Sequence, residues 1–95
     1  MTFSVYILYS SKLDNYYVGT TDNVERRLGE HNTKEHEGSF STKGIPWELK
    51  FVIDNLSSSQ AYAIEKHIKK MKSAVYIENL MRYSEMAEKL KIKFQ

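Results

Sequence analysis

Five side chains in this sequence have types and spacings suited to chemistry. Tyr6 and Tyr17 are phenols eleven residues apart, each within a short run rich in β-branched and aromatic residues. Arg27 and His31 are four residues apart, which places them on one face of a helix. Glu65 is a lone carboxylate in a segment rich in lysine. Together these residues supply two phenols, a permanent cation, an imidazole and a carboxylate that can bind a metal ion.

This set of groups suits the hydrolysis of a phosphodiester. A guanidinium binds a non-bridging phosphate oxygen and offsets the charge that develops in the transition state. One carboxylate is enough to hold Mg²⁺, which keeps several waters and takes its remaining ligands from the substrate phosphate. A phenol beside a cation can accept a proton from water, although its free pKa of ~10 makes this demanding. An imidazole can orient the nucleophile or relay the proton.

Each of these residues also has a purely structural interpretation. Tyrosines in strands are usually half-buried packing residues, and paired arginines on a helix usually face solvent. A histidine near the end of a helix complements the macrodipole. Glu65 can simply pair with Lys69 one helical turn later. The chemistry therefore depends on whether the fold brings these side chains together.

Length and composition restrict the classes to which the protein can belong. The 95 residues fit one domain, residues 1–95, with 41% hydrophobic and 27% charged residues. The absence of cysteine excludes disulfides and thiolate chemistry. A zinc site made of His31, His36 and His67 is an alternative that their irregular spacing disfavours. No apolar run approaches the ~18–20 residues needed to span a bilayer, and the N-terminus has no signal-peptide pattern. We therefore expect a cytoplasmic protein without a membrane partner or a small-molecule cofactor.

The charge is unevenly distributed along the chain. Residues 1–50 carry six Lys and Arg against seven Asp and Glu, whereas residues 51–95 carry eight against five. Clustered lysines attract a polyanion, because each phosphate contact releases a condensed counterion. A solvated helix face is the alternative interpretation. The residues predicted to contact nucleic acid are Lys66, Lys69, Lys70, Lys72 and Lys43.

The periodicity predicts a mixture of strands and helices. Residues 3–9, 16–20 and 47–54 have the alternation and the β-branched content of strands. Asp22 is a candidate N-cap for a helix that runs to about Asn32, and residues 33–46 are predicted to form a long loop.

A capping box begins a second helix after the third strand. Ser57 and Gln60 form this box, and Ala61, Ile64, Ile68 and Met71 line one apolar stripe behind it. Further helical stretches are predicted around residues 77–81 and, more weakly, over 84–92. The order predicts an α+β fold with a three-stranded, mainly antiparallel sheet flanked by three or more helices.

Four segments of the chain form a recognisable pattern: Ser4-Val5-Tyr6, Tyr17-Val18-Gly19, residues 23–32 and residues 63–71. They resemble the GIY-YIG nuclease superfamily, and in particular its small standalone bacterial members. The resemblance covers residues 3 to about 75 and leaves 76–95 as a C-terminal helical extension. Ser4 departs from the pattern, since it stands where the family name has glycine. Asn79 is the nearest candidate for an asparagine that many relatives place late in the module.

The resemblance implies a role for each matching residue. The implied active-site residues are Tyr6, Tyr17, Arg27, His31 and Glu65, with Glu65 binding the metal and Gly19 as the motif glycine. The implied function is that of an endonuclease that hydrolyses DNA with one Mg²⁺ or Mn²⁺ ion, in repair or recombination. Two alternatives remain open at this point. Instead of an endonuclease, the chain could be a nucleic-acid-binding module with little or no catalysis, or a structural domain whose tyrosines only pack.

Overall fold

An antiparallel three-stranded sheet is the centre of the molecule. The structure is a computed structural model that describes residues 2–33 and 43–95. The sheet consists of β1 (Phe3–Ser10), β2 (Asn15–Thr21) and β3 (Trp47–Leu56), in the order β2-β1-β3. Both pairings are antiparallel, so β1 is the central strand and β2 and β3 form the edges. The predicted α+β fold is confirmed.

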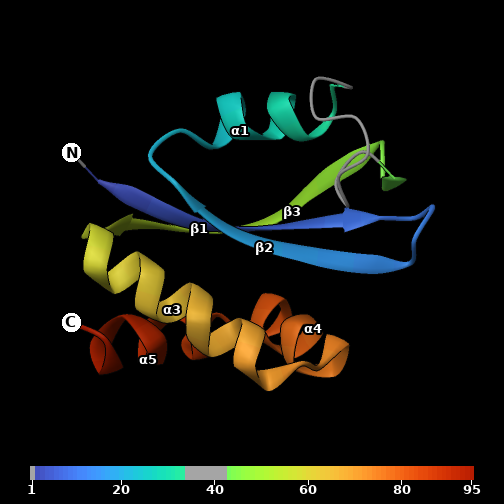
Figure 1. The fold of residues 1–95 in the computed structure, drawn as a ribbon. Helices are drawn as coiled ribbons and strands as arrows, with labels where there is room; N and C mark the ends of the chain where they lie inside the picture. The colour runs from blue at the N-terminus through green and yellow to red at the C-terminus, as the bar shows by residue number, and fades with distance from the viewer. Residues whose placement is uncertain (1, 34–42) are drawn as a thin grey trace.

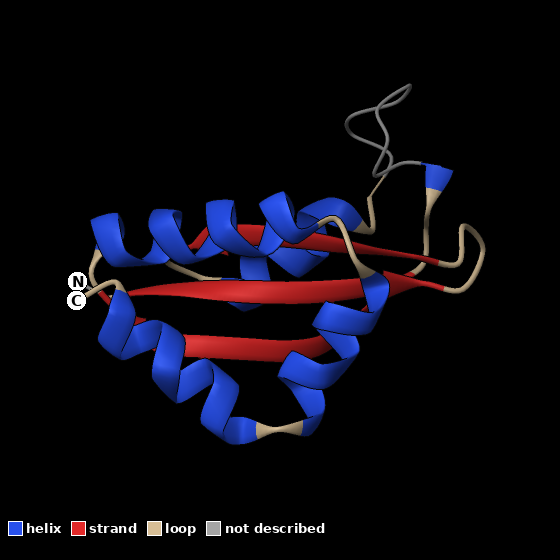
Figure 2. Cartoon of the chain, turned by 90° about the horizontal axis from the view of Figure 1, so that it is seen from below, coloured by secondary structure: helices blue, strands red, loops and turns tan. Residues whose placement is uncertain are grey.

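Helices cover both faces of this sheet (Figure 1). The helix α1 (Val24–His31) lies on one face, while α3 (Ser58–Met71), α4 (Ala74–Arg82) and α5 (Ser84–Lys93) lie on the other (Figure 2). In residues 2–33 and 43–95 we find no helix that is both long enough and apolar enough to span a bilayer. Most of the predicted long loop, including His36, lies outside the described residues.

The central strand is buried on both of its faces. Val5 and Ile7 belong to the core shared with α3, whereas Tyr6 and Leu8 belong to the core beneath α1. All four side chains are at most 1% exposed. The sequence pattern predicted a single buried face with period two. A strand covered by helices on both sides instead reads as a continuous apolar run, and residues 5–8 form such a run.

The third strand does not keep one face toward the core along its whole length. Trp47 packs beneath α1, Ile53 packs toward α3, and Leu49 is 40% exposed. The β1–β3 pairing shifts register between Ile7 and Leu8. A shift of one residue exchanges the two faces of a strand, so the predicted alternation over residues 47–54 holds only in part.

Two of the three helices beneath the sheet, α3 and α4, begin at a serine whose hydroxyl caps the helix. The Ser57 hydroxyl accepts a hydrogen bond from the Gln60 backbone N–H, and the Gln60 side chain accepts one from the Ser57 N–H. The predicted capping box is therefore confirmed. Met71 was predicted to lie on the buried stripe but is 44% exposed, because α3 ends there and Lys72 turns into the left-handed region at φ 48°. Ser73 then caps α4.

The helix α1 is short and is tied to the sheet at its end. Its N-cap is Asn23, whose side chain accepts a hydrogen bond from the Arg26 N–H at 3.0 Å, and not Asp22 as predicted. After the last turn, the Asn32 amide accepts a hydrogen bond from the Trp47 N–H at 2.6 Å and donates one to the Trp47 carbonyl at 3.0 Å. This two-way contact fixes the C-terminal end of α1 against the start of β3.

We predict that Asn32→Ala lowers the free energy of unfolding by about 1–3 kcal/mol, because it leaves two partly buried backbone groups of Trp47 without their partners. Urea denaturation followed by the fluorescence of Trp47 measures the loss. Thr33→Ala is the matched control, since it removes only an exposed hydrogen bond to the Glu30 carbonyl. Equal effects of the two substitutions would show that the Asn32 contact does not hold α1 in place.

Candidate active site

The site begins with a close contact between neighbouring strands. Tyr6 on β1 and Gly19 on β2 are direct partners in the antiparallel register. A Cβ atom built on Gly19 would overlap the Tyr6 hydroxyl and would lie 2.9 Å from ring carbon Cε1. Only glycine therefore allows the Tyr6 ring to lie across β2 at this point. The glycine that the sequence pattern singled out has its physical explanation in this contact.

The Tyr6 hydroxyl reaches the last residue of α1 from below. Its oxygen lies 3.0 Å from His31 Nε2, and both side chains are buried, at 1% and 5% exposure. The imidazole ring packs edge-on against Tyr17, with 4.5 Å between the ring centroids. It also packs against Trp47, the strand residue that Asn32 holds. His31 is thus fixed by contacts from all three strands.

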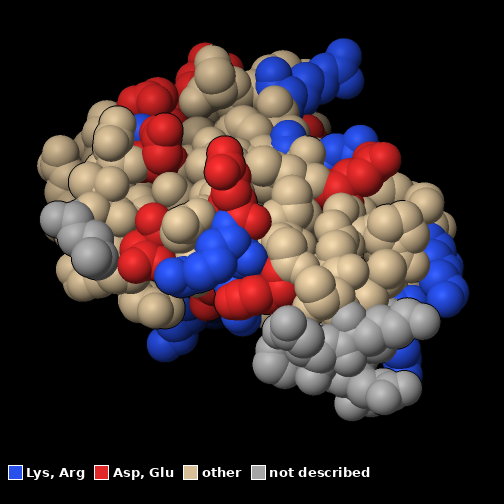
Figure 3. Space-filling view, turned by 90° about the horizontal axis from the view of Figure 1, so that it is seen from above, with Lys and Arg blue, Asp and Glu red and all other residues tan. Residues whose placement is uncertain are grey.

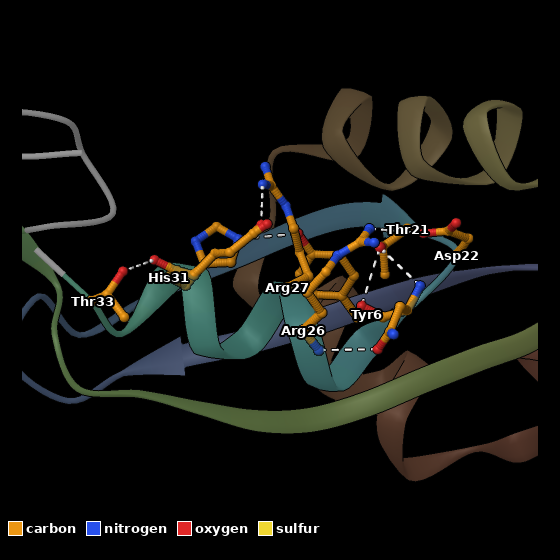
Figure 4. Close-up of polar contacts among 9 residues, drawn as sticks. Tyr6, Thr21, Asp22, Arg26, Arg27, His31 and Thr33 are labelled. Carbon is orange, nitrogen blue, oxygen red and sulfur yellow. Dashed lines mark hydrogen bonds and ion pairs between the residues drawn. The ribbon is translucent and has the colours of Figure 1, made fainter. Parts of the chain in front are cut away.

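Arg27 lies one helical turn before His31 and faces the same hydroxyl. The guanidinium interacts with Tyr6 and Tyr17, which raises the pKa of Arg27, and its Nη1 lies 3.5 Å from a carboxylate oxygen of Glu30. The neighbouring Arg26 instead turns to Asp22, with 2.9 Å between the paired atoms (Figure 4). Of the two adjacent arginines, Arg27 faces the tyrosines and Arg26 is paired with Asp22.

Burial dominates the protonation of Tyr6. Removal from water raises the pKa of the Tyr6 phenol to about 12, although the hydrogen bond and the charge of Arg27 oppose this effect. Tyr6 is therefore neutral at pH 7. Because a guanidinium can only donate, the Tyr6 oxygen accepts from Arg27. The direction of the hydrogen bond between Tyr6 and His31 Nε2 is set by the tautomer of the imidazole. The sequence argument that a nearby cation ionises a phenol does not hold for Tyr6.

Tyr17 occupies a more open position than Tyr6. Its ring stacks beside Tyr6, with centroids 6.3 Å apart, and is half-buried rather than fully enclosed. Tyr17 also borders a groove of about 360 Å³ between β2, α3 and α4. Of the two tyrosines, Tyr17 is the one that a molecule in the groove can touch.

Tyr6, Tyr17, Arg27 and His31 form a cluster on the α1 face of the sheet. Glu65 approaches this cluster from the opposite side of the sheet. It lies on α3, its side chain is 20% exposed, and its Oε2 is 3.6 Å from Lys69 Nζ. The Lys69 ammonium also lies 5.9 Å from the centre of the Tyr17 ring. The charge of Glu65 raises the pKa of Tyr6, which places the carboxylate within electrostatic reach of the phenols. Because β2 is an edge strand, α3 side chains can reach around it to the α1 face.

The available ligands fit a hard cation that keeps most of its own water. Within residues 2–33 and 43–95, we find no cluster of three His, Cys, Asp or Glu side chains that would enclose a metal ion. A single carboxylate such as Glu65 suits Mg²⁺ or Mn²⁺, whose other ligands are waters and phosphate oxygens. The predicted zinc alternative gains no support, because His67 packs against Phe94 and Tyr76.

The lysines predicted as one patch divide between two surfaces. Lys69 and Lys72 line the groove beside Tyr17, whereas Lys66 and Lys70 line a separate hollow of about 230 Å³ beside Phe94. Lys43 is exposed next to the undescribed segment. On the face above α1, acidic and basic side chains are intermixed (Figure 3). Of the predicted lysines, Lys69 and Lys72 in the groove are therefore the ones that adjoin Tyr17.

Two contributors to the site were not predicted from the sequence. Trp47 supports both His31 and Tyr17, with centroid distances of 6.4 and 6.0 Å, and Asn32 holds the Trp47 backbone. Asn32 directly follows a predicted site residue, but its partner is fifteen residues later in the chain. No local sequence pattern predicts a contact between residues this far apart in the chain.

A known protein family matches most of the length of this chain. The family described as the GIY-YIG catalytic domain matches residues 2–81. The chain is similar to the structure-specific endonuclease subunit SLX1 of Phaeosphaeria nodorum strain SN15, with 34% identity over 62 residues. The match covers 62% of this chain and 17% of the relative, so the chain spans less than a fifth of that protein's length. No solved structure matches the chain.

We predict that Gly19→Ala lowers the free energy of unfolding by about 1–3 kcal/mol, because the added methyl group must displace the enclosed Tyr6 ring. Gly29→Ala is the control: nothing lies within 4 Å of its Cβ, and alanine in a helix stabilises by about 0.5–1 kcal/mol. Urea denaturation of both variants gives the comparison. If Gly19→Ala is as stable as the parent, the close contact does not constrain Tyr6.

Proposed function

Because the chain belongs to the GIY-YIG nuclease family, we propose that it is a metal-dependent endonuclease that hydrolyses phosphodiester bonds in DNA. The observation that supports this most strongly is the convergence of side chains from separate elements. Tyr6, Tyr17, Arg27 and His31 make mutual contacts on the α1 face, and Glu65 reaches the same place from α3.

Arg27 is the group that we propose binds the scissile phosphate. It is partly buried, its guanidinium is held by Tyr6 and Glu30, and it is oriented before any substrate arrives. A preorganised donor stabilises the charge on the phosphoryl oxygens without having to reorganise during the reaction. The planar fork also allows two parallel hydrogen bonds to phosphate oxygens.

The two tyrosines have different proposed roles. Tyr6, with a pKa of about 12 and 1% exposure, orients Arg27 and His31 and does not take a proton from water. Tyr17 borders the groove and contacts the His31 ring. We therefore assign to Tyr17 the orientation of the attacking water, with His31 as the neighbouring group that can exchange a proton.

Glu65 is the proposed protein ligand for one Mg²⁺ or Mn²⁺ ion. When bound, the ion supplies Lewis-acid polarisation of the phosphate and lowers the pKa of a bound water. The carboxylate fits because it pairs with Lys69, whose ammonium lies 5.9 Å from the centre of the Tyr17 ring and whose side chain lines the groove. It also keeps enough exposure, 20%, to exchange its counterion.

The substrate is proposed to be recognised by its shape and backbone. The relative from Phaeosphaeria nodorum is named a structure-specific endonuclease subunit, and this supports a substrate chosen by the structure of the DNA. A role in repair or recombination is part of the proposal. Lys69 and Lys72 offer charge to the phosphate backbone beside the site, which positions DNA without reading its sequence.

Glu65→Gln is predicted to abolish Mg²⁺-dependent nicking of supercoiled plasmid while changing the free energy of unfolding by less than about 1 kcal/mol, since its pair with Lys69 is long, at 3.6 Å, and the lysine is 53% exposed. Gel analysis of plasmid topology and urea denaturation measure the two effects. Glu88→Gln is the control, because Glu88 pairs with Lys91 on α5 and neither residue lines the groove. Salt-sensitive DNA binding without any nicking by the parent protein would instead indicate a binding module.

Arg27→Ala is predicted to reduce the single-turnover cleavage rate about a hundredfold or more, the scale of losing one preorganised charge donor. Arg26→Ala should cost severalfold at most, because Arg26 is exposed and paired with Asp22. Arg27→Lys should restore little of the rate, since a point charge cannot replace the planar fork. Equal losses at positions 26 and 27 would show that both arginines supply only general attraction for DNA.

A further inference from the structure

Lys69 lies between the groove, the Glu65 carboxylate and the Tyr17 ring. Its ammonium lies 3.6 Å from Glu65 Oε2 and 5.9 Å from the centre of the Tyr17 ring, and its side chain lines the groove together with Lys72. Among the described residues, Glu65 forms an ion pair with Lys69 and with no other lysine or arginine. Lys69 is therefore the counterion of the carboxylate that the proposed function assigns to the metal.

The pair between Lys69 and Glu65 is loose. A separation of 3.6 Å exceeds the usual ~2.7–2.9 Å of a charge-assisted hydrogen bond. The Lys69 side chain is 53% exposed, whereas that of Glu65 is 20% exposed. A lysine has a long, flexible stem, so its ammonium can move while the carboxylate stays in place.

A divalent cation and the Lys69 ammonium compete for Glu65. Both are positive, so each lowers the affinity of the carboxylate for the other. A phosphate in the groove offers the ammonium a second anionic partner close to its present position. Lys72 lines the same groove and adds to the attraction. Whatever draws Lys69 toward the groove therefore makes Glu65 more available to a metal ion.

Resting on the proposed function, we infer that Lys69 couples DNA binding to metal binding. In the free protein its ammonium is the counterion of Glu65, and a DNA phosphate bound in the groove takes over that ammonium. Lys69 is a positioning residue in this scheme and does not act on the reacting atoms. Because coupling between two binding events is reciprocal, metal binding must also strengthen the hold of Lys69 on DNA.

The first test measures metal binding without DNA or catalysis. Isothermal titration of Lys69→Met with Mn²⁺ should give a dissociation constant at least about threefold lower than that of the parent protein, because the competing charge is gone. Lys66→Met is the matched control, since Lys66 lies on the same helix but lines the hollow beside Phe94, and it should leave the constant unchanged. Unchanged or weaker Mn²⁺ binding by Lys69→Met overturns the inference.

The second test measures the coupling itself. In an Arg27→Ala background, which slows cleavage, fluorescence anisotropy gives the affinity for a DNA duplex with and without saturating Mn²⁺. The ratio of these affinities should be smaller when Lys69 is also replaced by methionine. Replacing Lys72 by methionine in the same background should weaken DNA binding. The ratio of the affinities with and without Mn²⁺ should then equal that of the Arg27→Ala protein. An equal ratio with and without Lys69 overturns the inference.

A third variant separates this inference from the proposed function. If Glu65→Gln binds Mn²⁺ as tightly as the parent protein, Glu65 is not the metal ligand, and both the metal site and the coupling are wrong. If Glu65→Gln loses Mn²⁺ binding while Lys69→Met leaves it unchanged, the metal site stands and only the coupling fails.

Discussion

The packing of the Tyr6 ring against the backbone of Gly19 is the contact on which the site depends. It joins the central strand to an edge strand and directs a buried hydroxyl toward α1. His31 and Arg27 are both arranged around that hydroxyl. A bulkier residue at position 19 would move the ring, and the helix residues that meet it would lose their common partner.

The helix that carries Arg27 and His31 is not stable by itself. Eight residues are too few for an independent helix, because the cost of nucleation is recovered only over a longer segment or through packing. Its stability comes from the Asn23 cap, from the Asn32 contact with Trp47 and from the apolar surface beneath it. The same contacts that fold α1 therefore also place its functional side chains.

Differences in burial give chemically similar residues different properties. Tyr6 is enclosed between β2 and α1, and its pKa rises despite the neighbouring guanidinium. Tyr17 is at the edge of the sheet, where the groove and Lys69 adjoin it. Because β2 has no neighbouring strand beyond it, side chains of α3 reach this edge and bring a carboxylate to a cluster built on the opposite face.

The sequence by itself determined the elements and the candidates. Alternation identified the strands, the Ser57 box identified the start of α3, and the four-residue spacing put Arg27 and His31 on one face. Tertiary structure decided the features that depend on residues far apart in the chain. These are the burial of β1 on both faces, the register shift in β3 and the Asn32–Trp47 contact. It also decided that Tyr6 stays protonated and that Lys69 pairs with Glu65 at the groove. Local patterns record only neighbours along the chain, whereas desolvation and charge pairing depend on residues that meet only after folding.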